Sequence, residues 1–425
     1  MDQRTLVGVL VVLMFGGFSS VVAANPLDAF EVGARESAMG GAGTASSDGI
    51  AAMYYNPAAA GIERDFVLLF GVSANEDSIE VNGTDAEIDA HVRYTAGLSS
   101  ALPLWDGLGE RLRFGLLLSI PHGHFYDLQL PDEQSPHFPL LDQGPRRLLA
   151  SAALAFELFE GLHLGVGASV MPHVRGDVHI DIADEQGDNN ASVLAEYDVG
   201  AEFGIRYDVL SWFSLGIAYR MAKESEIDIP VDVRISDAIP PVYARLSSVA
   251  YSMPHTLRIG AAVSPLEELG FSADVVWSKY SDFHGPNPVV WVYDASGRVV
   301  QESRAASSPL SDTLAIHLGG EWRFLEDWAL RAGYAYVPSP VPAQEGAANQ
   351  LDADRHCVSA GLGFELQLDT ERSTQAIELG LHGSLMLLDE RSFEKTEFLP
   401  GAAGFPSLSM SGLYYGAGAE MKLRF

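Results

Sequence analysis

Cysteine and basic residues are scarce in this chain of 425 residues. Its one cysteine, Cys357, excludes an internal disulfide and a cluster of thiolate metal ligands, and we assign it no role. Lysine and arginine number 26 against 57 acidic residues, which leaves a net charge of −31. Nucleic-acid binding needs a basic surface, so this charge argues against a nucleic acid as partner. The acidic excess fits a solvated surface.

Long apolar runs are missing as well. Residues 1–24 are typical of a secretory signal peptide, because Arg4 gives a charged start, residues 6–15 are apolar, and Val22-Ala23-Ala24 forms a small-residue cleavage site. Beyond residue 24 we find no apolar stretch of about 18 residues, so we expect no transmembrane helix. An exported chain of this kind is periplasmic, secreted or an outer-membrane barrel.

Side chains alternate along the end of the chain. Residues 413, 415, 417, 419, 421, 423 and 425 are apolar, whereas the residues between them are small, aromatic or charged. A strand places alternate side chains on opposite faces, so one face here is suited to lipid and the other to a polar lumen. This is typical of the closing strand of an outer-membrane β-barrel. A soluble sandwich strand alternates too, so the rest of the chain has to repeat the pattern.

The alternation does recur, in about fourteen segments, an even number as bacterial barrels have. They are residues 66–74, 91–101, 111–120, 147–158, 162–170, 199–207, 213–221, 256–264, 271–279, 313–324, 328–337, 356–366, 376–387 and 411–425. Short turns such as 209–212 and 325–327 alternate with long connections: 122–146, 173–196, 222–253, 280–312, 338–355 and 388–410. The sequence therefore predicts an all-β fold, a transmembrane antiparallel β-barrel over residues 65–425.

Residues 25–64 do not alternate and precede the first predicted strand. They are rich in small residues, and residues 51–55 suit one short helix that Asn56-Pro57-Ala58 would end as a turn. The segment is too apolar for a disordered tail. We interpret it as a plug inside the barrel, which fits the glycines on the inward parity of the strands.

Five motifs resemble the FadL/TodX family of outer-membrane transporters of hydrophobic compounds. Gly-Gly-Ala-Gly-Thr-Ala at residues 40–45, followed by Asp48 and Tyr-Tyr-Asn-Pro-Ala at 54–58, resembles the N-terminal hatch of that family. Further likenesses lie at residues 253–260, 274–277, 330–342 and 351–355, where Leu351 replaces the family's proline, and at the terminal Phe425. The resemblance implies a fourteen-stranded barrel closed by a hatch.

The resemblance also implies a function. Family members move long-chain fatty acids or aromatic hydrocarbons passively across the outer membrane, with no cofactor. The ligand binds an apolar groove among outer loops, then a deeper site, and leaves sideways into the bilayer after the hatch rearranges. We expect fatty acids as the ligand, outer-membrane lipid as the surroundings, and a monomer. Aromatic hydrocarbons, a non-transport barrel that scaffolds a surface or secretion complex, and a hydrophilic porin stay open as alternatives.

Candidate site residues follow from the route that this family uses. Asn56, Pro57 and Ala58 would form the hatch element that gates the lumen, or else a fixed turn. The third predicted strand ends at Pro121, and Gly123 follows; proline lacks a ladder donor, so a lateral opening or a plain strand end is expected there. The next loop is unusually apolar, which indicates either an external binding groove or a loop packed on its neighbours. Its apolar residues are Phe125, Tyr126, Leu128, Leu130, Phe138, Leu140 and Leu141.

A fatty-acid head group needs a cation in a partly dry lumen. Five arginines lie on the inward parity and are candidate carboxylate anchors: Arg111, Arg113, Arg258, Arg323 and Arg331. On the lipid face each would cost about 2–4 kcal/mol at mid-depth, which supports this assignment of faces. Alternatively they pair with luminal carboxylates in the wall. His122, His124, Asp127 and His137 suggest a metal or hydrolase site, but no nucleophile shares a face with them, so we expect neither enzyme nor metal.

Overall fold

The computed structural model describes residues 32–62, 65–86, 90–102, 111–123, 138, 148–181, 190–234, 242–283, 289–294, 296–304, 309–346, 348–369, 374–395 and 405–425. The predicted signal peptide, residues 1–24, lies outside the described residues. Within the described part of the chain, no helix is long and apolar enough to cross a membrane.

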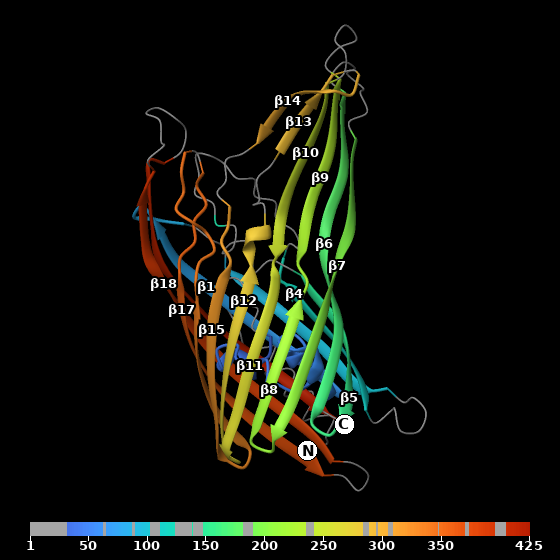
Figure 1. Cartoon of the computed structure of the whole chain (residues 1–425), viewed down its shortest axis with the longest axis vertical. Helices are drawn as coiled ribbons and strands as arrows, with labels where there is room; N and C mark the ends of the chain where they lie inside the picture. The colour runs from blue at the N-terminus through green and yellow to red at the C-terminus, as the bar shows by residue number, and fades with distance from the viewer. Residues whose placement is uncertain are drawn as a thin grey trace.

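Fourteen antiparallel strands form a closed barrel in the described part of the chain (Figure 1). In order around the barrel they are β1 (Val67–Val81), β3 (His91–Ala101), β4 (Leu112–Pro121), β5 (Leu149–Phe159), β6 (Leu162–Asp181), β7 (Asn190–Leu210), β8 (Phe213–Arg220), β11 (His255–Leu266), β12 (Leu269–Lys279), β15 (Thr313–Leu325), β16 (Trp328–Val337), β17 (Arg355–Asp369), β18 (Thr374–Glu394) and β19 (Ser407–Arg424). The ring closes where β19 pairs with β1 from Val67↔Arg424 to Val81↔Met410. Each of these strands overlaps a predicted segment, so the predicted barrel is confirmed.

The two faces of the wall differ as the alternation predicts. Large apolar side chains point outward and are exposed, for example Ile205 at 46%. Glu202, three positions earlier on the same strand, points inward and is only 4% exposed. An apolar exterior with buried charges inside is the reverse of a soluble protein and is what a lipid-facing wall requires.

The long connections are more ordered than the sequence pattern indicates, and this part of the prediction is wrong. Residues 222–253 contain β9 (Lys223–Arg234) and β10 (Val242–Met253), and residues 280–312 contain η2 (Tyr280–Asp282), β13 (Val289–Tyr293) and β14 (Val299–Arg304). β6 and β7 also run into the predicted connection 173–196, and β9 pairs with β6 in parallel. These strands project beyond one end of the barrel (Figure 1). The pair β1 and β2 (Thr84–Asp85) forms a smaller hairpin.

Residues 32–62, here called the N-terminal segment, lie inside the barrel (Figure 1, blue). Helix α2 (Ala34–Ala38) packs on β16 to β19, α3 (Gly49–Ala52) on β1, β3 and β4, and the 3₁₀ helix η1 (Pro57–Gly61) on β4 to β7. Their small side chains are almost entirely buried. Such close approach is possible because the facing strands carry glycine on the inward parity.

Candidate functional site

The turn at Asn56-Pro57-Ala58 is fixed to the wall by one amide side chain. Asn56 is fully buried, and its Oδ1 accepts a hydrogen bond from the Ala58 amide at 3.0 Å, which caps η1. Its Nδ2 donates to the Thr44 carbonyl at 2.9 Å and to the Ile205 carbonyl of β7 at 3.0 Å. One side chain therefore joins two parts of the N-terminal segment to each other and to the barrel.

Two wall glycines provide the space for this turn. A Cβ on Gly165 of β6 would lie 2.2 Å from the Ala58 nitrogen, and one on Gly204 of β7 would lie 2.1 Å from Asn56 Oδ1. Real Cβ atoms do not approach other atoms so closely, so any side chain at either position would displace the turn. The sequence pattern predicts that these two glycines face inward, and in the structure they make room for the turn.

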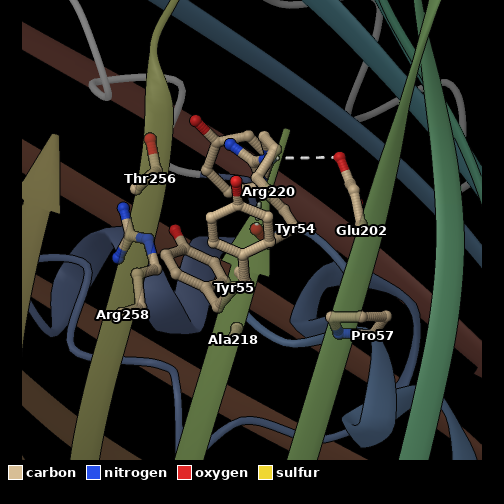
Figure 2. A pocket seen from close by; sticks show the side chains of 9 residues that line it. Tyr54, Tyr55, Pro57, Glu202, Ala218, Arg220, Thr256 and Arg258 are labelled. Atoms are coloured by element: carbon tan, nitrogen blue, oxygen red, sulfur yellow. Dashed lines mark hydrogen bonds and ion pairs between the residues drawn. The ribbon is translucent and has the colours of Figure 1, made fainter. Parts of the chain in front are cut away.

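A tyrosine–arginine cluster lies beside the turn (Figure 2). The guanidinium carbon of Arg220 lies 4.5 Å from the centre of the Tyr54 ring, and that of Arg258 lies 5.5 Å from the centre of the Tyr55 ring. The cavity between them has a volume of about 10 Å³, enough for a single water molecule. An acyl chain can enter this site only after the tyrosines move.

Arg258 is the anchor candidate with unpaired guanidinium nitrogen atoms, although its charge interacts with the buried carboxyl group of Asp274 on β12. It is 3% exposed, and its Nε and Nη1 have no hydrogen-bond acceptor among the described residues. Strand register explains this, because its cross-strand neighbours are Val276 on β12 and Ala218 on β8. Buried cations are normally paired, so this guanidinium is suited to a carboxylate brought by a ligand.

Arg331 and Arg323 instead belong to the wall. Arg331 lies opposite Glu321 in the register of β15 and β16, and its Nε lies 2.7 Å from Glu321 Oε2. Arg323 approaches the same carboxylate at 3.7 Å, and its side chain is 63% exposed. Both arginines contact a carboxylate of the wall, which is the arrangement predicted as the alternative to a ligand anchor.

The remaining two arginines differ from each other. Arg111 precedes β4, is exposed, and reaches the Leu158 carbonyl at 3.4 Å. Because Arg111 lies before the strand begins, its inward orientation stays a prediction. Arg113 is inward and 4% exposed, as predicted.

Two buried cations, Arg220 and Lys223, were not among the site residues predicted from the sequence. Arg220 Nε lies 3.0 Å from Glu202 Oε1, and Lys223 Nζ lies 3.8 Å from the same oxygen. The inward parity of β8 would have identified Arg220, because Gly216 and Ala218 share its face. Lys223 begins β9, in a stretch that was taken for a connection.

The region predicted for a lateral opening is regular as far as it is described. β3 and β4 pair without a register shift from Ala101↔Arg113 to Arg93↔Pro121, and β4 pairs with β5 as far as Ser119. Pro121 ends the strand, and Gly123 follows with φ of 90°. An opening here stays a prediction.

The predicted external groove is largely outside the described residues, where Phe125, Tyr126, Leu128, Leu130, Leu140 and Leu141 all lie. Phe138 is described and is 7% exposed, in an apolar cluster with Leu351 and Tyr414. Cys357 is buried in the same cluster. Among the described residues, no group of three or more His, Cys, Asp and Glu side chains could hold a metal ion.

Comparison with known proteins gives the family. Residues 17–374 match the family model described as "Outer membrane protein transport protein (OMPP1/FadL/TodX)". The chain belongs to this family. Alkane uptake protein A of Marinobacter nauticus is 23% identical over 378 residues, which cover 82% of this chain and 80% of that protein. A long-chain fatty acid transport protein of Salmonella typhi is 22% identical over 214 residues, 48% of this chain and 45% of that protein.

Solved structures agree on the fold. The crystal structure of the Pseudomonas putida toluene transporter TodX has a TM-score of 0.57 at 16% identity and covers 95% of this chain and 99% of that one. A Pseudomonas aeruginosa FadL homologue has the same TM-score at 14% identity. The family membership makes this chain an outer-membrane transport protein for hydrophobic compounds of a Gram-negative bacterium, and not an enzyme.

Proposed function

We propose that this protein carries long-chain fatty acids passively across the outer membrane and binds their carboxylate at Arg258. The observation that supports this most directly is a buried guanidinium with two unpaired N–H groups, stacked on Tyr55 of the N-terminal segment. A neutral hydrocarbon would leave those N–H groups without an acceptor. A carboxylate would pair with it in a dry site, where charged hydrogen bonds contribute most.

The proposed route follows the family. A fatty acid binds first at the predicted external groove, then at Arg258, and the displaced Tyr55 moves the hatch element Asn56-Pro57-Ala58. The ligand then leaves sideways near Pro121 and Gly123. The cavity at Arg258 is too small for a head group while Tyr55 stays in place. This supports coupling between ligand binding and movement of Tyr55.

The acyl tail supplies most of the affinity and the head group supplies the selectivity. Each methylene withdrawn from water contributes about 0.8 kcal/mol, whichever head group follows it. A carboxylate–guanidinium hydrogen bond contributes about 1.5–3 kcal/mol, or about ten- to hundredfold in affinity. Fatty acids should therefore bind more tightly than alkanes of equal length by this factor.

The test is binding of a fluorescent long-chain fatty acid to detergent-purified protein, with palmitate, hexadecane and toluene as competitors. We expect palmitate to displace the probe best, and Arg258→Gln to lose about ten- to hundredfold in palmitate affinity while hexadecane is unaffected. Arg111→Gln, at an exposed arginine, is the matched control. Arg258→Lys, which keeps the charge, should lose less than Arg258→Gln.

Alkane uptake is the second candidate, because the alkane uptake protein matches 82% of this chain. Displacement by hexadecane that equals displacement by palmitate, with no effect of Arg258→Gln, would favour it. Displacement by toluene alone would indicate aromatic hydrocarbons. Absence of saturable binding would favour a scaffold, and steady conductance in a planar bilayer would favour a porin.

A further inference from the structure

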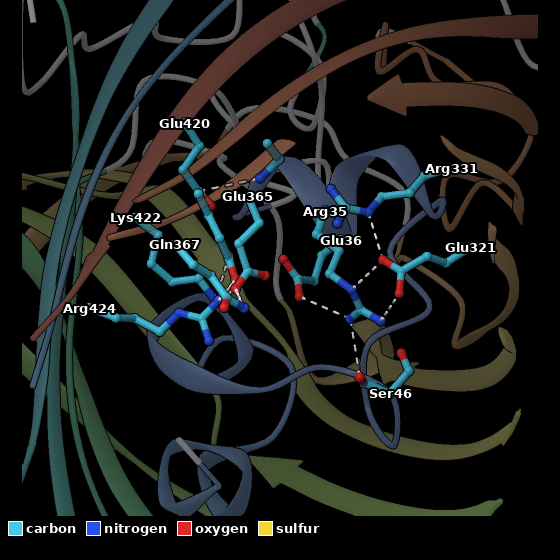
Figure 3. Close-up of polar contacts among 12 residues, drawn as sticks. Arg35, Glu36, Ser46, Glu321, Arg331, Glu365, Gln367, Glu420, Lys422 and Arg424 are labelled. Atoms are coloured by element: carbon cyan, nitrogen blue, oxygen red, sulfur yellow. Dashed lines mark hydrogen bonds and ion pairs between the residues drawn. The ribbon is translucent and has the colours of Figure 1, made fainter. Parts of the chain in front are cut away.

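A second set of polar contacts holds the N-terminal segment through Arg35 (Figure 3). Arg35 of α2 reaches across to β15, where its Nε lies 2.9 Å from Glu321 Oε2 and its Nη2 lies 3.4 Å from Oε1. Its Nη1 donates to the Ser46 carbonyl at 3.1 Å. Arg35 therefore ties the start of the segment both to the wall and to a later part of the segment.

Glu321 has a second cationic partner besides Arg35. Arg331 of the neighbouring strand stays within 2.7 Å of the same carboxylate. Arg35 itself is 24% exposed, so its guanidinium borders on solvent. If Arg35 departs, the wall carboxylate stays paired and the released guanidinium can be hydrated. This lowers the cost of separation below that of breaking an isolated buried pair.

Arg35 also stands between two large cavities. One has a volume of about 400 Å³ and reaches the turn at Glu267 and Glu268; the other, of about 670 Å³, reaches the turn at Glu326 and Asp327. Arg35, Asp48 and Arg323 line both cavities. The short turns of outer-membrane barrels face the periplasm, so both cavities lie on the periplasmic side of the N-terminal segment.

The far end of α2 is held differently. The Gly40 amide donates to Ser359 Oγ at 3.0 Å, and the Gly40 carbonyl lies 2.7 Å from His317 Nδ1. Gly40 and Gly41 have φ of 63° and 75°, a backbone region that glycine adopts at little cost. The segment therefore has a fixed point beside two glycines with positive φ. Before that point, α2 is held by Arg35, by the Ala34 amide, which donates to Glu420 Oε2 of β19 at 3.3 Å, and by packing on the wall.

We propose that Arg35 and Glu321 form an ionic latch on the periplasmic side, whose release lets α2 pivot at Gly40–Gly41 and joins the two cavities. This goes beyond the proposed function, because the latch contains no ligand-binding group and operates whichever hydrophobic compound is carried. The lumen would then have a second movable element, α2, whose movement does not depend on the Tyr55 site.

The test is hydrogen exchange of the full-length protein in detergent, with Arg35→Gln and Glu321→Gln. Five residues do not sustain a helix without packing, so release of α2 exposes its amides. We expect exchange within residues 34–39 to become about ten- to hundredfold faster in both variants, with residues 49–61 unchanged. Glu378→Gln is the matched control, because Glu378 pairs with Lys422 and Arg424 of the wall.

A second readout is the labelling rate of Met39→Cys by a membrane-impermeant thiol reagent, in a Cys357→Ser background. Met39 is 2% exposed and borders the 400 Å³ cavity, so latch release should speed its labelling. Unchanged exchange and labelling in both latch variants would overturn the proposal. Equal acceleration across residues 34–61 would overturn it too, because the whole segment would then loosen without a pivot. Fatty-acid binding that fails while these results hold would refute the Arg258 site alone.

Discussion

Substitution of Gly165 by alanine should loosen the N-terminal segment selectively. The new Cβ would lie 2.2 Å from the Ala58 nitrogen, 2.3 Å from the Pro57 carbonyl carbon and 2.6 Å from Ala58 Cα. Ordinary contacts between such atoms are about 3.5 Å, so the turn has to retreat by about 1 Å. β6 cannot yield instead, because it is paired with β5 and β7 on both sides of Gly165.

The cost can be worked from the contacts. Overpacking of this kind costs about 1–3 kcal/mol. A retreat of the turn also lengthens the hydrogen bond from Asn56 Nδ2 to the Ile205 carbonyl, and leaving the buried Asn56 amide unpaired has a similar penalty. Taking about 2 kcal/mol, local opening of residues 49–61 becomes about thirtyfold more frequent, since 1.4 kcal/mol is a factor of ten.

Hydrogen exchange resolved to peptides measures this directly. Gly71→Ala is the control, because Gly71 is also a strand glycine, but its added Cβ meets its nearest atoms at 3.5, 3.6 and 3.8 Å, which is ordinary contact. Exchange of residues 49–61 in Gly165→Ala that matches Gly71→Ala would refute the reasoning, because the wall would then absorb the methyl group.

Two further predictions concern the same segment. Asn56→Ala removes three hydrogen bonds of a buried side chain and should destabilise the turn by about 3 kcal/mol or more, seen as protease cleavage within residues 49–61 while the barrel still resists unfolding in detergent; intact protection would contradict it. Burial raises the pKa of Glu36, although Arg35 opposes the shift. The folded state then binds more protons than the unfolded state, so stability falls as pH rises from about 4.5 through the raised pKa. Glu36→Gln should remove this slope, and equal slopes of melting temperature against pH in both proteins would exclude Glu36 as its source.

The barrel was predictable because lipid and lumen impose opposite demands on neighbouring residues. Strands in the outer projection have a weaker signal. Residues 227–233 alternate, but their polar positions are acidic and Pro230 interrupts them, which is typical of a loop. β9 forms nevertheless, because it pairs with β10 and with the extended β6. Tertiary pairing of this kind is not visible in a local pattern.

The site was predictable only in part, for a reason of register. Inward parity selected Arg258 and Arg331 equally, since both are arginines within strands. Whether such a cation is paired depends on the residue that lies across from it: Glu321 for Arg331, but Val276 and Ala218 for Arg258. Those neighbours lie on other strands, and a shift of one position in the strand register would place different residues beside each arginine.

The closure of β19 on β1 has a consequence for assembly. The N-terminal segment precedes β1 and ends up enclosed by the fourteen strands, so seating it before the first and last strands meet avoids threading it into a closed ring. That last pairing joins opposite ends of the chain and is the costliest in loop entropy. We therefore expect the wall glycines that contact the segment to matter during folding too. A segment that does not fit between the strands would hinder closure of the barrel.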